Sequence, residues 1–144
     1  MKIVLDTSIL IRANEHSFGL ARELLIRIVN SEHRLVLSNE ILHELARVLR
    51  YPRLQKFYDL SENLIYDYVS FLRLSSEIVP LNPLITAPIR DVNDVIVMQT
   101  AIIGEAHILC AKDGDFFHSP AAEYLKKMGI TVIDDIALMT RLRS

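Results

Sequence analysis

Acidic side chains stand directly after several apolar segments of the chain, where a parallel sheet would gather them at one edge. Asp6, Asp113 and Asp115 follow apolar runs. Asp91 and Asp94 open an apolar helical segment, and Glu44 lies in the helical segment after the second apolar run. Each alone has an ordinary explanation, because aspartates cap helices and stabilise turns, and a glutamate is often solvated. Several carboxylates at one edge need a compensating partner, and a bound divalent cation is the commonest one. The pattern therefore predicts a metal site built from carboxylates.

The ligand types indicate which metal such a site would bind. The chain has one cysteine, Cys110, and its five histidines show no ligand spacing, which argues against zinc. Oxygen ligands favour Mg²⁺ or Mn²⁺. One or two such ions suit phosphoryl transfer, because they activate water, clamp the phosphate and offset charge on the leaving oxygen.

Glu44 is the candidate ligand within a helical segment. On a wheel of about 100° per residue, Glu44 borders the apolar stripe that contains Ile41 and Val48, whereas His43 and Arg47 point away from it. A carboxylate at the margin of a core needs a compensating partner, which supports a role for Glu44 in the metal site.

The elements that must position these acids alternate along the chain. Short apolar runs predict strands over residues 3–5, 35–37, 78–79, 108–110 and 131–133. Apolar residues at helical spacing predict helices over residues 18–29, 41–49, 61–74, 92–103 and 120–129. Strands alternating with helices indicate a single domain over residues 1–144, with a three-layer α/β/α architecture and a mostly parallel central sheet.

Several residues mark where these helices begin and end. Ser38 and Ser119 are predicted N-caps, and Pro120 is the predicted first residue of its helix. Pro52 is expected to stop the helix that contains Glu44, and Gly104 suits the end of the apolar helix before it.

Composition excludes several classes of protein. The chain has 144 residues, 51% of them apolar, and a net charge of −2, which argues against binding nucleic acid by bulk electrostatics alone. No apolar run is long enough for a membrane span, and the start lacks a signal-peptide pattern, so we expect a cytoplasmic protein. The high apolar content favours surface covered by a partner or a second copy.

Four segments, taken in order, resemble the PIN-domain (PilT N-terminal domain-like) family of metal-dependent ribonucleases. They are VLDTSIL from residue 4, SNEILHELARVL from residue 38, residues 91–101, and KDGDF from residue 112. More narrowly, the chain is similar to the bacterial and archaeal VapC-like toxin components. The resemblance covers nearly the whole chain and implies a PIN-like, exonuclease-like fold.

The resemblance implies an acidic quartet that binds Mg²⁺ or Mn²⁺, formed by Asp6, Glu44, Asp94 and Asp113. Asp115 is then an additional acid near the metal, and Asp91 is a secondary candidate for the place of Asp94. Family members typically form homodimers and cut RNA, and a small antitoxin holds many of them inactive. An RNA substrate, a cognate antitoxin and a homodimer are therefore expected here.

The hydroxyl of Thr7 or Ser8 is expected to support the Asp6 carboxylate. The chain departs from the family at Ser8, where Asn is commoner, and at Ala111 and Lys112, where Thr or Ser with Gly is usual. Loss of a hydroxyl at Ala111 weakens support for the metal. Lys112 is a candidate contact for substrate phosphate.

Basic residues recur at three-residue spacing, namely Arg47, Arg50, Arg53 and Lys56. Two interpretations stay open: a solvated helix face, or a track for RNA phosphates that Arg90 and Lys112 extend. Arg47, Arg50 and Lys112 are the candidate substrate-binding residues.

Two other functions of α/β proteins require acidic residues that this chain lacks at the necessary positions. A haloacid-dehalogenase-type phosphatase needs a second Asp two positions after Asp6, where this chain has Ser8, and a response-regulator receiver needs paired acids near the first strand. The alternative that remains is a non-catalytic PIN-fold module that binds RNA or a protein through the same edge.

Overall fold

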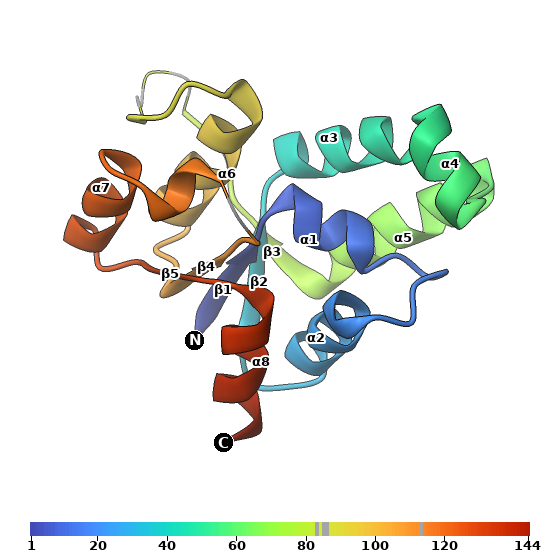
Figure 1. Ribbon diagram of the computed structural model, residues 1–144, viewed down its shortest axis with the longest axis horizontal. Helices are drawn as coiled ribbons and strands as arrows, with labels where there is room; N and C mark the ends of the chain where they lie inside the picture. Colours follow the sequence, from blue (N-terminus) through green and yellow to red (C-terminus); the bar gives the residue numbers. More distant parts are fainter. Residues whose placement is uncertain (83, 85–86, 113) are drawn as a thin grey trace.

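The computed structural model describes residues 1–82, 84, 87–112 and 114–144. Five strands form one sheet (Figure 1): β1 (Lys2–Leu5), β2 (Arg34–Leu37), β3 (Ser76–Ile78), β4 (Ile108–Cys110) and β5 (Thr131–Ile133). Every neighbouring pair is parallel, in the order β3-β2-β1-β4-β5. The chain runs outward from β1 through β2 and β3, and then returns to β4 on the other side of β1. The carboxyl end of β1 is thus the switch point at which such sheets bind ligands.

Helices cover both faces of this sheet, as the alternating pattern predicts. They are α1 (Thr7–Arg12), α2 (Leu20–Val29), α3 (Asn39–Leu49), α4 (Pro52–Tyr58), α5 (Glu62–Ser75), α6 (Val92–Ile103), α7 (Ala121–Lys127) and α8 (Asp135–Arg143). Helices α1, α2, α3 and α5 lie on one side of the sheet and α6 and α7 on the other, while α8 packs against α2 (Figure 1). None of the helices in the described part of the chain is long and apolar enough to cross a membrane.

The central strand carries the core. Ile3, Val4 and Leu5 of β1 are fully buried, because neighbours pair with the strand on both edges and helices cover both of its faces. A strand buried in this way is a continuous apolar run, and this is the pattern that the sequence presents. Asp6 follows at once, so the first acid of the chain stands at the end of its most buried strand.

Two buried hydroxyl contacts fix the helices that carry the acids. The hydroxyl of Tyr68 on α5 donates to the Leu10 carbonyl of α1 over 2.7 Å, and burial raises the Tyr68 pKa above its usual value. The hydroxyls of Ser38 and Thr100 are hydrogen-bonded at 2.9 Å, which joins the start of α3 to α6 across the switch point. Ser38 also accepts the Ile41 backbone N–H, so it is the N-cap that the sequence predicts.

Three helices were not predicted from the sequence. Helix α1 begins directly after Asp6, whose side chain caps it, where only a turn was expected. Pro52 does end the α3 pattern, but it is also the first residue of α4, a position at which the missing N–H of proline costs nothing. Helix α8 follows Asp134, whose side chain accepts the Ala137 N–H.

Two expected boundaries are wrong. Ser119 makes no capping hydrogen bond, and Pro120 occupies the N-cap position of α7 in place of the first helical position. The third strand covers Ser76–Ile78 and not residues 78–79, because it pairs with β2 from Leu35 to Leu37 and Ser76 is the partner of Leu35. The register with β2 therefore sets this strand, and its own apolar run does not.

Gly104 ends α6 as predicted, and it does so because of close packing. Its φ is −75°, which any residue adopts, but a Cβ there would lie 2.6 Å from Val36 Cγ1 and 2.9 Å from the Thr100 carbonyl oxygen. The absence of a side chain lets the end of α6 press against β2.

We predict that Gly104→Ala lowers the free energy of unfolding by about 1–3 kcal/mol, the usual cost of forcing a methyl group into a packed core. Chemical denaturation with circular dichroism measures this change. The control is Gly19→Ala, since nothing lies within 3.7 Å of a Cβ there, and its effect is limited to a few tenths of a kcal/mol from the altered α2 N-cap. Equal destabilisation by both variants would contradict the packing argument.

Candidate functional site

An acidic cleft lies at the carboxyl edge of the sheet, with a volume of about 230 Å³. Its lining is Asp6, Thr7, Ser8, Ile11, Glu44, Val48, Asp91, Asn93 and Asp94. Four of the acids singled out in the sequence therefore line one cleft, although they come from three distant parts of the chain. Asp113, the remaining member of the expected quartet, lies outside the described residues.

Asp6 is held in place by the first turn of α1. Its Oδ1 accepts the Thr7 backbone N–H at 2.7 Å, and its Oδ2 accepts the Ser8 hydroxyl at 3.0 Å. Its own N–H donates to the Cys110 carbonyl of β4 over 2.9 Å, which ties the residue to the sheet. The expected hydroxyl support for Asp6 is thus present, and Ser8 provides it, while Thr7 contributes its backbone.

Glu44 projects from α3 at the margin of the core, as its position on the helical wheel predicts. Its side chain is only 12% exposed, and its Oε2 accepts two hydrogen bonds from Arg47, at 2.6 Å from Nη2 and 3.1 Å from Nε. Arg47 is exposed as expected, but its guanidinium turns back to Glu44 and lies 5.5 Å from the centre of the Tyr51 ring. The hydrogen bond to Glu44 raises the Arg47 pKa.

The start of α6 contributes two aspartates with different roles. Asp91 is exposed and caps the helix, because its Oδ1 accepts the N–H groups of Asn93 at 2.8 Å and Asp94 at 3.3 Å. Asp94 is half-buried within the first turn. Both line the cleft, so the structure assigns the cap to Asp91 and leaves the Asp94 carboxylate as the better placed of the two for binding.

Asp94 carries the clearest electrostatic signature of the cleft. Its pKa is raised to about 6, first by burial and then by the negative charges of Asp6, Asp91 and Asp115. A carboxyl group disfavoured in its charged form by like charges is typical of functional sites. The cleft is therefore short of positive charge.

The remaining predicted residues lie at the borders of the cleft or away from it. Asp115 begins a 3₁₀ turn at residues 115–117 and is exposed, close enough to act on the Asp94 pKa. Arg50 pairs with Glu62 of α5 at 2.9 Å, which lowers the Glu62 pKa. That pairing favours the solvated-face interpretation for Arg50.

Asp135 is a further acid of this edge that was not predicted from the sequence. It follows β5, its side chain is 2% exposed, and it lies 3.4 Å from Arg12 and 3.9 Å from Lys112. The signal was present, since an acid after the fifth strand meets the same criterion as Asp6. Asp135 anchors two cations, so Lys112, a candidate phosphate contact, is also part of an ion pair.

The residues fit a divalent cation by donor type. Carboxylate oxygens are the ligands that Mg²⁺ and Mn²⁺ prefer. Burial first and neighbouring carboxylates second raise the Asp94 pKa, and a cation would offset the charge of those neighbours. Within the described residues, however, no three His, Cys, Asp or Glu side chains lie close enough together to hold one metal ion. The cleft thus has the right ligand chemistry, and binding requires its carboxylates to close around the ion.

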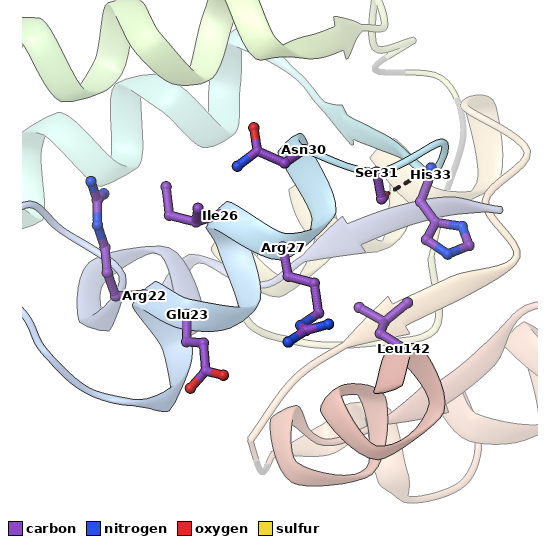
Figure 2. Close-up of a pocket in the computed structure, with 8 residues that line it drawn as sticks. All are labelled: Arg22, Glu23, Ile26, Arg27, Asn30, Ser31, His33 and Leu142. Atoms are coloured by element: carbon purple, nitrogen blue, oxygen red, sulfur yellow. Dashed lines mark hydrogen bonds between the residues drawn. The ribbon is translucent and has the colours of Figure 1, made fainter. Parts of the chain in front are cut away.

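A larger hollow, about 610 Å³, lies at the opposite end of the sheet between α2 and α8 (Figure 2). Its lining includes Arg27, Asn30, Ser31, His33 and Leu142. Its carboxylate, Glu23, is paired with Arg143 at 2.8 Å. This hollow faces the amino ends of the strands, where α/β sheets seldom bind ligands, so the acidic cleft is the better candidate site.

Comparison with known proteins agrees with this fold. A family model described as a PIN domain matches residues 2–115. Among solved structures, a chain of the VapBC2 complex of Rickettsia felis, bound to a DNA fragment from its promoter, is similar with a TM-score of 0.58. The two chains are 15% identical, and the match covers 93% of this chain and 98% of that one, which is a likeness of fold. No curated protein matches the chain.

We predict that Asp94→Asn stabilises the metal-free chain at pH 8. Folding raises the Asp94 pKa from its ordinary value of 3.8 to about 6, so the charged carboxyl costs stability above pH 6, and this cost is lost as the pH falls towards 4. Full burial would make the cost about 3 kcal/mol, and because Asp94 is partly exposed, solvent screening reduces it to about 1 kcal/mol.

Urea unfolding at pH 8 and pH 4 in EDTA measures this difference. The matched control is Asp67→Asn, which removes an exposed carboxylate from the middle of α5. A stabilisation by Asp94→Asn that is the same at both pH values, or no larger than that of the control, would contradict the electrostatic account of the cleft.

Proposed function

The chain belongs to the PIN-domain family, and we propose that it is a Mg²⁺- or Mn²⁺-dependent endoribonuclease, the toxin component of a toxin–antitoxin pair acting in the cytoplasm. One observation carries the proposal: four carboxylates, from the end of β1, from α3 and from the start of α6, line a single cleft at the switch point of the sheet. Burial and the charges of Asp6, Asp91 and Asp115 raise the Asp94 pKa there. Such a cleft suits a metal-assisted reaction on a phosphodiester.

The residues that would hold the metal are Asp6, Glu44, Asp94 and Asp113, with Asp115, Asp91 and Ser8 at its border. A bound divalent ion would supply Lewis acidity and positive charge, which activate water and stabilise the transition state of phosphoryl transfer. The proposed reaction is hydrolysis, in which the oxygen of a water molecule bonds to phosphorus and the bond from phosphorus to the leaving oxygen breaks.

In the proposed enzyme, neighbouring side chains and backbone groups orient the carboxylates of the cleft. The Ser8 hydroxyl and Thr7 N–H fix the orientation of the Asp6 carboxylate before any ligand arrives. Arg47 pairs with Glu44, and if Glu44 held a divalent ion, the Arg47 guanidinium would be available at the border of the cleft to contact a phosphate oxygen. Preorganised carboxylates reduce the rearrangement that binding requires.

A second candidate function is a non-catalytic PIN-fold module that binds RNA or a protein. Two observations favour it: the described carboxylates are not yet close enough to hold an ion, and Lys112 pairs with Asp135 where the family has a small residue. Metal-dependent turnover separates the two functions.

We predict that the purified chain cleaves a mixed-sequence RNA in Mn²⁺ or Mg²⁺ and not in EDTA. Asp6→Asn and Asp94→Asn each reduce cleavage by about 100-fold or more, because each removes a charge that the reaction needs. Asp67→Asn, on an exposed face of α5, retains activity and reveals any contaminating nuclease. Cleavage that both site variants leave unchanged would reject the nuclease, and no cleavage with no Mn²⁺-induced rise in melting temperature would favour the binding module.

Exposed apolar side chains support the proposed partners. Tyr66 and Leu74 on the outer face of α5 are 72% and 88% exposed, and they line a hollow of about 480 Å³ with Val69. Phe57 on α4 is 79% exposed, and Phe18 before α2 is 99% exposed. We propose that the α5 face contacts a second copy, which leaves the α4 and α2 side for an antitoxin.

For the homodimer, we predict that light scattering at tens of micromolar gives twice the 16.5 kDa mass of one chain. Leu74→Glu on α5 should produce a monomer, because it places a charge in an apolar contact. Phe57→Glu makes the same kind of change on α4 and should leave the dimer intact. A native chain that scatters as a monomer would reject the dimer, and dissociation by both variants would reject the α5 contact.

A further inference from the structure

A second hollow adjoins the acidic cleft and has a volume of about 310 Å³. Its lining is Pro88, Ile89, Arg90, Asp115, His118, Ser119, Pro120 and Ala121. Two of its residues place it next to the cleft. Arg90 directly precedes Asp91, which lines the cleft, and Asp115 is close enough to Asp94 to raise the Asp94 pKa. The lining residues come from the segment before α6, from the 3₁₀ turn and from the start of α7.

The hollow holds polar groups that the fold does not use. Arg90 and His118 are exposed, and neither side chain makes a hydrogen bond or an ion pair with any described residue. Arg47 and Arg50, by contrast, are both paired with glutamates. Arg90 thus supplies available positive charge at the edge of a cleft whose own charges are negative.

These groups suit one class of ligand. A guanidinium binds phosphate oxygens through its planar set of donors, and an imidazole stacks on a nucleobase or donates to its edge. Pro88, Ile89 and Pro120 give the hollow apolar walls, against which a flat ring can lie. Its volume is in the range of pockets that hold small ligands, which includes a single nucleotide.

We propose that this hollow, which we call the Arg90 subsite, binds the nucleotide of an RNA next to the phosphate that lies in the acidic cleft. Arg90 binds the phosphate of that nucleotide, and His118 contacts its base. The inference rests on the proposed nuclease function and adds where the substrate strand runs: from the acidic cleft past Asp115 towards α7, on the side of the cleft opposite α3.

The test measures binding of a fluorescently labelled single-stranded RNA by anisotropy, in Mg²⁺, with every variant made in an Asp6→Asn background so that the probe stays intact. Arg90→Gln should weaken binding about tenfold and reduce the slope of log K against log salt by about 0.7, the value for one phosphate contact on a single strand. His118→Ala should weaken binding severalfold and leave that slope unchanged, because it removes a base contact and no charge.

The control is Arg27→Gln, which removes an equally exposed cation from the hollow at the other end of the sheet (Figure 2). It should change neither affinity nor slope, whereas Arg90→Lys should restore the slope without the full affinity. Weakening by Arg90→Gln no greater than by Arg27→Gln overturns the subsite while native RNA cleavage still upholds the nuclease. A chain that neither binds nor cleaves RNA overturns both.

Discussion

Carboxylates gathered and partly buried in one small cleft, where they also repel one another, are the constraint on which the rest of this structure depends. Each acid of the cleft but one has a local compensation: Asp6 accepts hydrogen bonds from the first turn of α1, Asp91 caps α6, and Glu44 pairs with Arg47. None of the described residues compensates the Asp94 carboxylate in a comparable way, and burial with the charges of Asp6, Asp91 and Asp115 raises its pKa to about 6. The chain therefore holds a charge arrangement that costs it stability, which is typical of sites kept for binding or catalysis.

The sheet and its helices supply the stability that offsets this cost. The order reversal at β1 brings segments distant in the chain to one edge, and buried contacts lock the helices there, including the Ser38 and Thr100 hydroxyl pair. Gly104 lets α6 approach β2 closely enough to make that pair possible.

The sequence predicts the parts that depend on buried apolar runs and local capping. Strands β1, β2, β4 and β5 follow from their apolar runs, Ser38 from its place before α3, and the marginal position of Glu44 from helical periodicity. The bounds of β3 do not, because its pairing with β2 sets them. Short helices leave too little pattern, which is why α1 was not found, and Pro52 fits both an end and a beginning. Arg47 turning back to Glu44 and the ion pairs of Asp135 depend on tertiary geometry, which spacing along the chain does not encode.

The acids of the cleft come from β1, α3 and α6, and the central strand β1 completes its pairing only when β4 joins it. A chain still under synthesis cannot complete this edge before β4 is made, and β4 follows β1, α3 and α6 in the sequence. The long-range topology of the sheet therefore delays assembly of the acidic cleft, and of any chemistry that the cleft performs, until β4 has paired with β1.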